Sequence, residues 1–148
     1  MPGERDLRES IGRLFARQRL AVLSTQATGQ PHGNLVAFAS TDDLALLLFA
    51  TRRDTAKYRR LRAEPRAALL VDDRSNREAD FQEAVAVTAL GTARDAEASE
   101  RARFLDLYLA RHPSLFGFAT APDCALLWVE VERYLVSGFR EVEELRLR

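Results

Sequence analysis

Cysteine is almost absent from this chain of 148 residues, which contains only Cys124. One cysteine excludes an internal disulfide and leaves no cysteine-based zinc site. No apolar run is long enough to span a bilayer. Residues 1–10 are charged and lack the apolar centre of a signal peptide. We therefore expect a cytoplasmic protein with no membrane partner.

Net charge is also lacking, because 22 basic residues balance 22 acidic residues. Overall electrostatics therefore give no reason to expect nucleic acid as a partner. The charge is uneven, however: residues 51–77 carry nine Lys and Arg against four acidic residues. No aromatic series suited to base stacking accompanies this basic stretch, which argues against a nucleic-acid interface.

Length and composition favour a single folded domain over residues 1–148. A chain of this length can bury a real core. Its 47% hydrophobic and 30% charged residues are typical of soluble globular proteins. The sequence shows no internal repeat, low-complexity tract or interdomain linker.

Seven strands are predicted from apolar and alternating runs. They cover residues 19–25, 31–40, 44–50, 66–71, 81–95, 124–131 and 134–142. Gly91 indicates a bulge or bend in the fifth strand, and residues 146–148 are expected to form a loose end. Strands joined by hairpins, with few helices, favour an antiparallel sheet closed into a small barrel.

Helices are predicted at three points. Residues 6–18 form an amphipathic helix, and a short helix follows residue 55. A third helix, residues 96–111, is expected to turn its inner face to the core, and residues 115–118 are expected to add one more turn. The inner residues of the first helix are Leu7, Ile11, Leu14 and Phe15, and those of the third are Ala102, Leu105, Tyr108 and Leu109.

The stretch 49–61 organises the chain, since a buried strand bends there into the short helix. Thr51, Arg52, Arg53, Thr55 and Lys57 bring hydroxyls and positive charge to the start of that helix. A helix N-terminus offers free N–H groups and a partial positive charge, which suit a phosphate. The same residues also fit a solvated basic helix capped by Asp54 or Thr55. Taken alone, the stretch leaves both interpretations open.

Several short motifs follow one another in a specific order. They are Gly29-Gln30-Pro31, the turn from Thr51 to Lys57, E-P-R-A-A-L-L-V at 64–71, D-D-R-S-N at 72–76 and R-Y-L-V-S-G-F at 133–139. In this order and spacing they resemble the pyridoxamine 5′-phosphate oxidase-like, FMN-binding split barrels over residues 7–145. The resemblance implies a mainly β fold, a six- to seven-stranded antiparallel split β-barrel of Greek-key topology with peripheral helices. It also implies a homodimer with FMN at the subunit interface.

The resemblance assigns cofactor-binding residues to four segments. One strand would line the flavin, largely through backbone groups, and the next strand would approach the ribityl phosphate. The bend and helix would bind the phosphate, and a loop from this or the second subunit would lie near the cofactor. The flavin-lining strand supplies Asn34, Leu35, Val36 and Ala37, and the next strand supplies Ala50 and Thr51. The phosphate-binding residues are Arg52, Thr55 and Lys57, and the loop residues near the cofactor are Arg74, Ser75 and Asn76.

Departures from the family pattern argue against oxidation of pyridoxamine phosphate itself. Those enzymes place Arg, Lys and Arg where this chain has Asn34, Ala39 and Ala56. They also continue into a C-terminal substrate segment that is lacking after Arg148. The expected activity is hydride transfer between flavin and an unidentified small molecule or NAD(P)H. The flavin carries that chemistry, so no catalytic residue and no metal ligand is assigned.

Alternative functions rest on other residues and cofactors. The protein could be a flavin carrier without turnover, an F420-dependent reductase or a haem binder. A haem ligand would come from His32 or His112, although His32 also fits a surface site and His112 a helix C-terminus. Trp128 fits either the core or the flavin side. Cys124 is expected to be a small buried residue, because no base is placed for it.

Overall fold

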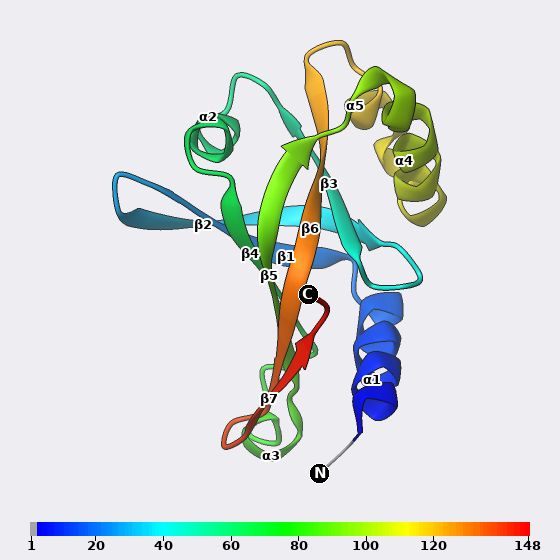
Figure 1. Cartoon of the computed structure of the whole chain (residues 1–148). Helices are drawn as coiled ribbons and strands as arrows, with labels where there is room; N and C mark the ends of the chain where they lie inside the picture. The colour runs from blue at the N-terminus through cyan, green and yellow to red at the C-terminus, as the bar shows by residue number, and fades with distance from the viewer. Residues whose placement is uncertain (1–2) are drawn as a thin grey trace.

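The computed structural model describes residues 3–148 and shows a closed β-barrel with helices packed on its outside (Figure 1). Its seven strands pair in the order β3-β2-β1-β4-β5-β6-β7, and β3 also pairs with β6. All these pairings are antiparallel. The first six strands therefore close into a barrel, and β7 extends the sheet beyond it. The predicted mainly β barrel is confirmed.

The strands are β1 (Leu20–Ala27), β2 (Gln30–Ser40), β3 (Leu46–Arg52), β4 (Arg66–Asp72), β5 (Ala86–Asp95), β6 (Cys124–Ser137) and β7 (Val142–Arg146). The helices are α1 (Glu4–Arg17), α2 (Ala56–Ala63), α3 (Asp80–Glu83), α4 (Ala98–Arg111) and α5 (Phe116–Ala119), and a 3₁₀ turn covers Pro113–Leu115. None of these helices is both long and apolar enough to cross a membrane.

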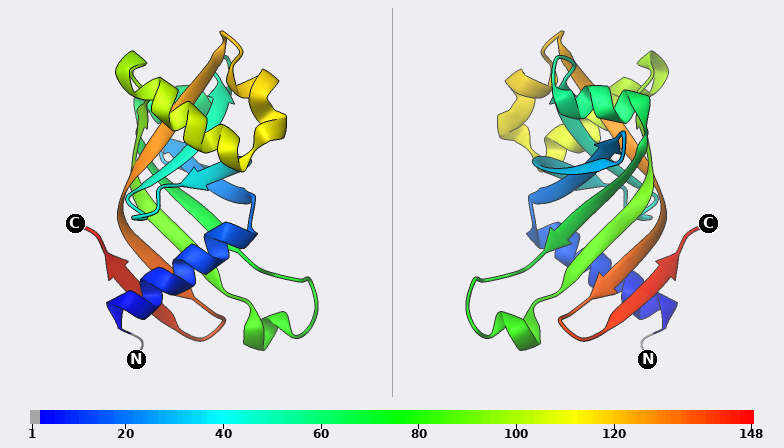
Figure 2. Two further views of the ribbon diagram at one scale, coloured as in Figure 1. Left: turned by 90° about the vertical axis from the view of Figure 1, so that its right-hand side faces the viewer. Right: turned by 90° about the vertical axis from the view of Figure 1, so that its left-hand side faces the viewer.

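Helix α1 packs on the lower half of the barrel, as two side views show (Figure 2). The four apolar residues predicted for its inner face are all buried and belong to the main core. The Phe15 ring meets Phe38 and Tyr134 edge-on, at centroid distances of 5.2 and 5.9 Å. The hydroxyl of Tyr134 donates to the carbonyl of Leu44 at 2.7 Å. Burial of this ring raises the pKa of Tyr134 above its usual range.

Helix α4 covers a second apolar cluster on the outer surface of β2, β3 and β6. Of the predicted inner face of this helix, Tyr108, Leu105 and Leu109 are confirmed, whereas Ala102 is wrong and Phe104 was not predicted. Phe104 and Tyr108, four residues apart, are buried, whereas Ala102 is exposed. The helix starts at Ala98, two residues later than predicted, and a capping box marks its first turn. Burial raises the pKa of Tyr108 to about 12, and its hydroxyl donates to Ala37 O at 3.1 Å.

Arg111 joins the ends of α1 and α4. Its Nη2 donates to the carbonyl oxygens of Phe15, Ala16 and Gln18 at 2.9, 2.9 and 2.8 Å. These carbonyls lie at the C-terminal end of α1, where the helix leaves them without internal partners. A cation there is also favoured by the helix dipole.

Replacing Arg111 with alanine is expected to lower the free energy of unfolding by about 2–3 kcal/mol, because several hydrogen bonds to a charged group are lost. Urea denaturation followed by circular dichroism measures the change. Arg103→Ala is the matched control, since that exposed arginine of α4 only stacks on Phe104. It should cost no more than about 1 kcal/mol. Equal losses in the two variants would contradict the role of Arg111.

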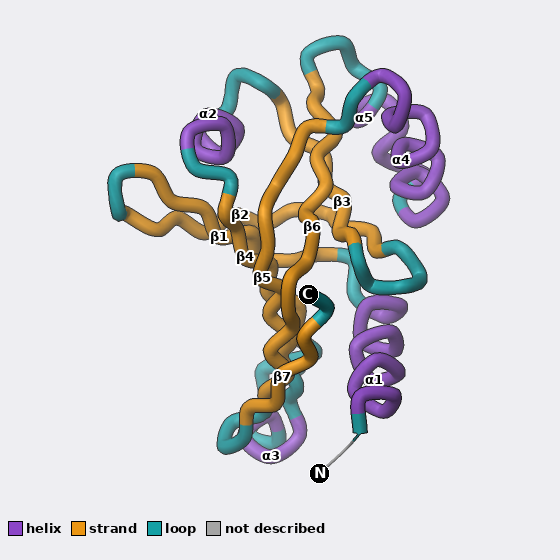
Figure 3. The backbone as a smooth tube through the Cα atoms, in the orientation of Figure 1, coloured by secondary structure: helices purple, strands orange, loops and turns teal. Residues whose placement is uncertain are grey.

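Two predicted strand assignments are wrong. Residues 81–85 lie outside β5; the segment begins instead with the short helix α3, in the long β4–β5 connection (Figure 3). The Asp80 carboxylate accepts hydrogen bonds from the backbone N–H groups of Ser75 and Asn76 at 2.9 and 2.7 Å, which folds this connection into a turn. These bonds hold the pKa of Asp80 below its usual value. Phe81, whose apolar character suggested a strand, points outward and is 54% exposed.

The last two predicted strands are joined in one continuous strand, β6, which ends at Ser137, and of the expected loose end only Arg146 belongs to β7. The polar pair Glu132–Arg133 suggested a break. Both residues stay in the strand because their charges are matched by Arg66 and Glu144, respectively. Leu145 of β7 is buried at 3% exposure. The predicted bulge at Gly91 is confirmed, since the β5–β6 register shifts between Leu90 and Gly91.

Candidate functional site

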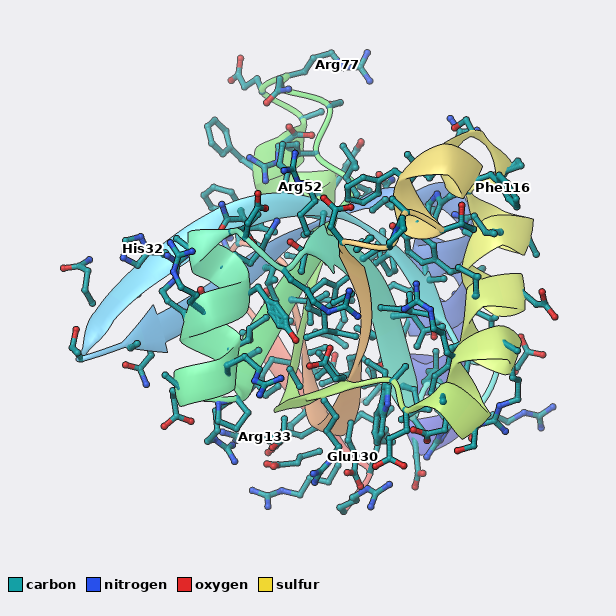
Figure 4. All side chains as sticks on the ribbon, turned by 90° about the horizontal axis from the view of Figure 1, so that it is seen from above. His32, Arg52, Arg77, Phe116, Glu130 and Arg133 are labelled. Carbon is teal, nitrogen blue, oxygen red and sulfur yellow. The ribbon has the colours of Figure 1, made fainter. Side chains whose placement is uncertain are left out.

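The end of the barrel where β3 runs into α2 carries most of the predicted phosphate residues. Figure 4 looks onto this end and labels Arg52, the last residue of β3. Thr55 begins α2: its backbone is extended and its Oγ1 accepts a hydrogen bond from the N–H of Tyr58 at 3.2 Å. Tyr58 and Leu61 are the buried residues of this helix. Its polar N-terminus is thereby held at the mouth of the barrel, where free N–H groups favour an anion.

The two threonines of this turn are bonded to each other, with 3.2 Å between their Oγ1 atoms. Thr55 Oγ1 also lies 2.9 Å from the carbonyl of Arg52. Thr51 is only 1% exposed, so its hydroxyl supports Thr55 from inside the barrel. Thr55 is half-buried and lies nearer the surface.

Lys57 and Arg60 form a pair of half-buried cations on α2. Arg60 Nε donates to Thr25 Oγ1 at 2.8 Å, and its Nη2 donates to Asn34 Oδ1 at 3.2 Å. Burial lowers the pKa of Lys57, and the positive charge of Arg60 lowers it further. Within residues 3–148, no ion pair includes either cation. Two adjacent, partly desolvated cations with only neutral partners favour binding of an anion.

Arg60 was not among the residues predicted from the sequence. It lies three residues after Lys57, which places both on the same side of a helix. That spacing was the available signal. The partners Thr25 and Asn34 come from β1 and β2, far from Arg60 in sequence, and they could be identified only from the folded barrel.

Arg52 is in a different electrostatic position. Its guanidinium contacts the carboxylates of Asp54 at 2.7 Å and Asp123 at 3.4 Å. Both carboxylates are exposed, so these pairs contribute little stability. They nevertheless neutralise Arg52, whereas Lys57 and Arg60 have no carboxylate partner within residues 3–148.

The predicted flavin-lining residues of β2 alternate between two faces of the barrel wall. Asn34 lies at the mouth of the barrel with Arg60, and Val36 is buried in the core. Leu35 is 69% exposed on the outer face. Ala37 and Ala50 lie in the cluster beneath α4. The strand therefore offers an open apolar surface only at Leu35.

Arg74, Ser75 and Asn76 lie at the opposite end of the barrel, in the connection to α3 (Figure 1). Arg74 forms two contacts with the carboxylate of Asp72, at 2.5 and 2.9 Å, which lower the pKa of that carboxyl. Arg74 and Asn76 border a cavity of about 800 Å³, whose lining includes Phe81 and Phe139. These two rings meet edge-on at 5.1 Å and are both exposed. In a single chain, the predicted cofactor-binding residues therefore lie at two opposite ends of the barrel.

The two histidines differ in their surroundings. His32 is exposed on β2 and projects away from the barrel (Figure 4). His112 is buried after the last turn of α4, with its Nε2 2.6 Å from the carbonyl oxygen of Phe38. This bond occupies the nitrogen with a structural contact.

Trp128 and Cys124 both belong to the cluster under α4. The Trp128 ring lies 6.0 Å from Phe104 and beneath the guanidinium of Arg94, which favours the core interpretation. Burial raises the pKa of the Cys124 thiol, so it stays protonated at neutral pH.

The family of this chain is settled by its sequence pattern. The pattern of the pyridoxamine 5′-phosphate oxidase family matches residues 7–137. The chain belongs to this family. No curated protein matches it.

Solved structures in this family's fold support the architecture. A heme binding protein from Mycobacterium smegmatis has a TM-score of 0.83 at 18% identity, covering 99% of this chain and 59% of that one. This chain thus spans little more than half of that protein. General Stress Protein 26 from Bacillus anthracis has a TM-score of 0.71 at 23% identity, covering 95% and 98%. A FAD-binding protein from Mesorhizobium loti has a TM-score of 0.68 at 17% identity, covering 86% and 89%.

Proposed function

We propose that this member of the pyridoxamine 5′-phosphate oxidase family is an FMN-binding flavoprotein that acts as an oxidoreductase on a small molecule. The observation that carries the proposal is the pair of half-buried cations, Lys57 and Arg60, beside the capped N-terminus of α2. Membership in the family and the described neighbours that bind a flavin or heme support a redox cofactor. FMN carries a single phosphate, which matches this one pair of half-buried cations.

The residues at this end fit a phosphate in charge and in hydrogen bonding. Lys57 supplies a point charge and Arg60 a planar fork of donors. The first N–H groups of α2 and the Thr55 hydroxyl supply further donors. An anion there would offset the repulsion between the two cations and would raise the pKa of Lys57 toward its usual value. Asn34 and Thr25 hold Arg60 in place through the bonds described above.

We further propose a homodimer with the cofactor at its interface. The phosphate residues and the Arg74–Asn76 loop lie at opposite ends of one barrel, so one chain cannot bring them together. A second copy can place its loop and the neighbouring Phe81–Phe139 surface against the first copy's α2 end. The exposed Leu35 would then be covered as part of the flavin wall.

Bound flavin would supply hydride transfer at its ring, with a small-molecule substrate or NAD(P)H as the other reactant. The chain's own residues bind the phosphate, orient the ring and exclude water from it. Among residues 3–148, no cluster of three or more His, Cys, Asp or Glu side chains is placed to hold a metal ion. Pyridoxamine phosphate is not the proposed substrate, because this chain has Asn34, Ala39 and Ala56 where the enzymes that oxidise it have Arg, Lys and Arg.

An absorption spectrum of the purified protein, before and after adding FMN, tests the cofactor. We expect a flavin spectrum, or saturable uptake with a change in flavin fluorescence, followed by bleaching under NAD(P)H without oxygen. Binding without reduction by any donor would favour a flavin carrier. If the protein is colourless and does not bind FMN but does bind F420, then F420 replaces FMN as the proposed cofactor. A protein that binds no flavin or deazaflavin would overturn it.

The haem alternative is favoured by one structural neighbour, the heme binding protein described above. Since Nε2 of His112 is occupied by Phe38 O, the exposed His32 is the better candidate for a ligand. A haem spectrum lost in His32→Ala, and kept in wild type, would support this alternative. A haem spectrum that is absent from both proteins would remove it.

Light scattering at micromolar concentration tests the dimer. We expect twice the mass of the 16.7 kDa chain. Leu35→Asp should shift the mass toward one chain, because it places a charge within the proposed contact. Arg13→Asp on the exposed surface of α1 is the control and should leave the mass unchanged. A monomer that still binds FMN tightly would contradict an interface cofactor.

FMN affinity is expected to fall as pH rises through the lowered pKa of Lys57, starting below the usual value of 10.5. Deprotonation removes the charge that binds the phosphate. Ligand-free protein should respond oppositely: between the two pKa values the unfolded chain binds more protons, so stability to unfolding rises with pH. Titrations between pH 7 and 10 measure the affinity. Lys57→Arg keeps its charge throughout and should flatten the profile; an equally steep profile in Lys57→Arg would contradict the assignment.

A further inference from the structure

A cavity of about 390 Å³ lies between α1 and α4, on the side of the barrel away from α2 (Figure 2). Its walls come from the two helices, from the end of β2 and from the turn between β2 and β3. The lining includes Gly12 and Phe15 of α1, Phe38 and Leu44 of the strand and turn, and Leu107 and Arg111 of α4. None of the residues predicted to bind the cofactor lines it, so the cavity is separate from the candidate site.

Large apolar side chains from three elements line this α1–α4 cavity. Phe15, Phe38 and Leu44 also belong to the main core, so their positions are fixed by packing on their other sides. Leu107 of α4 is half-buried and lies on the opposite wall. Small-molecule sites usually measure about 300–1,000 Å³ and have mainly apolar walls. The α1–α4 cavity therefore has the size and the surface to hold the apolar part of a small ligand.

Glycine at position 12 leaves the α1 wall of the cavity open. A Cβ atom there would meet nothing within 4 Å, so close packing does not require a glycine. Helix stability does not favour one either, because glycine is less favourable than alanine in a helix interior and Gly12 lies in the middle of α1. Space for a ligand beside α1 explains a residue that neither packing nor helix stability favours.

Arg111 brings a positive charge to the same cavity. Its Nη2 is occupied by the carbonyl oxygens at the end of α1, whereas Nε and Nη1 have no hydrogen-bond acceptor within residues 3–148. Neither nitrogen is among the buried unpaired atoms of the described chain, so both are accessible. The guanidinium also forms no ion pair with a carboxylate of residues 3–148. This half-buried cation can therefore donate further hydrogen bonds to an anion.

The charges of the lining favour a carboxylate over a phosphate. Among the described residues that line the cavity, Arg111 is the one cation and Asp42 the one carboxylate. A phosphate carries up to two negative charges, so a single guanidinium would not balance it and Asp42 would repel it. A carboxylate carries one charge, which one guanidinium matches.

We propose that the α1–α4 cavity binds a small monocarboxylate with an apolar body, such as an aryl or branched aliphatic acid. The carboxylate accepts hydrogen bonds from the free nitrogens of Arg111. The apolar body lies against Phe15 and Phe38, in the space beside Gly12. The site does not depend on a flavin, because no residue of the α2 end lines the cavity.

NMR titrations of the full-length protein with phenylacetate, isovalerate and the neutral analogue phenylacetamide test this proposal. Wild type is expected to bind the two acids with a Kd of about 1 mM or below, and phenylacetamide at least about tenfold more weakly, because the amide lacks the charge. Equal affinity for phenylacetate and phenylacetamide would overturn the contact with Arg111. Failure to bind either acid at about 10 mM would overturn the site.

Filling the cavity separates binding at this site from binding elsewhere. Gly12→Leu places a side chain in the open space without altering Arg111, and it should raise the Kd for phenylacetate at least about tenfold. Arg13→Leu is the matched control, because it adds the same side chain at the next, exposed residue of α1 and should leave the Kd unchanged. Unchanged affinity in Gly12→Leu would overturn the site. Thermal melts establish that each variant is folded.

Two further variants test the charge. Arg111→Lys keeps one positive charge for the carbonyls of α1 but loses the planar set of donors, so it should also weaken phenylacetate binding about tenfold. Unchanged affinity in this variant would overturn the role of Arg111. Lys57→Ala should leave the Kd for phenylacetate unchanged. A loss of phenylacetate binding in Lys57→Ala would place the acid at the α2 end and overturn the site, while leaving the proposed function standing.

Discussion

Replacing Lys57 with alanine is expected to weaken FMN binding by about 1–3 kcal/mol, which is roughly 5- to 150-fold in Kd. The variant loses a half-buried cation that has no carboxylate partner, so the ligand loses a charge-assisted contact and the fold loses little. Titration followed by flavin fluorescence measures the change. Arg13→Ala, on the exposed face of α1, removes the same charge far from α2 and should leave the affinity unaltered.

Arg60→Ala extends this experiment to a double-mutant cycle. Arg60 adjoins Lys57 and is held by Thr25 and Asn34, so both cations should act on one phosphate. We expect the two substitutions to be non-additive, because removing either cation relieves the repulsion between them, and the charge of Arg60 helps to lower the pKa of Lys57. Additive losses would indicate two separate anion sites. Unchanged affinity in both variants would exclude the end of α2 as the phosphate site.

Lys57 is the only lysine in the chain, and this allows a chemical test. An amine-selective acylating reagent can modify only the Lys57 ammonium group and the chain's α-amino group. The lowered pKa of Lys57 should make its free amine unusually reactive at pH 8. Saturating FMN should protect it, and peptide mass spectrometry separates the two amines. Modification of Lys57 at the same rate with and without FMN would contradict its contact with the ligand.

Much of the barrel could be predicted because the alternation of apolar and polar residues within a strand indicates which side chains are buried. Strands β1, β2, β3 and β4 and the inner face of α1 follow from apolar spacing alone. Prediction failed where distant partners decide the structure. The polar Glu132 and Arg133 remain within β6 because Arg66 and Glu144 meet them across the sheet. The apolar Phe81 suggested that the strand begins there, yet the turn at Asp80 leads into the short helix α3 and leaves residues 81–83 exposed.

In the candidate site, too, local sequence predicts some residues, and contacts distant in sequence decide the others. Thr55 as helix cap and Lys57 beside it follow from local helix chemistry. The partners of Arg60 depend on how β1 and β2 meet α2. The placement of Arg74 at the far end of the barrel depends on the path of β4. Whether its loop meets a flavin depends in turn on the second copy, which sequence periodicity does not describe.

Replacing Gly91 with alanine is expected to destabilise the fold by about 2–4 kcal/mol, in the range of severe overpacking in a core. A Cβ atom at this position would lie 2.0 Å from the backbone oxygen of Glu130 and 3.0 Å from Cγ1 of Val129. Backbone cannot rotate away as a flexible side chain can. The substitution must therefore separate β5 from β6 at the bulge, in the most extensively paired region of the barrel wall.

Urea denaturation of Gly91→Ala, compared with wild type, measures this loss. Gly12→Ala is the control, because a Cβ there meets nothing within 4 Å and the residue lies in the middle of α1. It should stabilise the protein by about 0.5–1 kcal/mol, since alanine loses less conformational freedom in a helix than glycine does. The two substitutions add the same methyl group and should change stability in opposite directions. Equal stability of Gly91→Ala and wild type would contradict the close approach of β5 and β6 at the bulge.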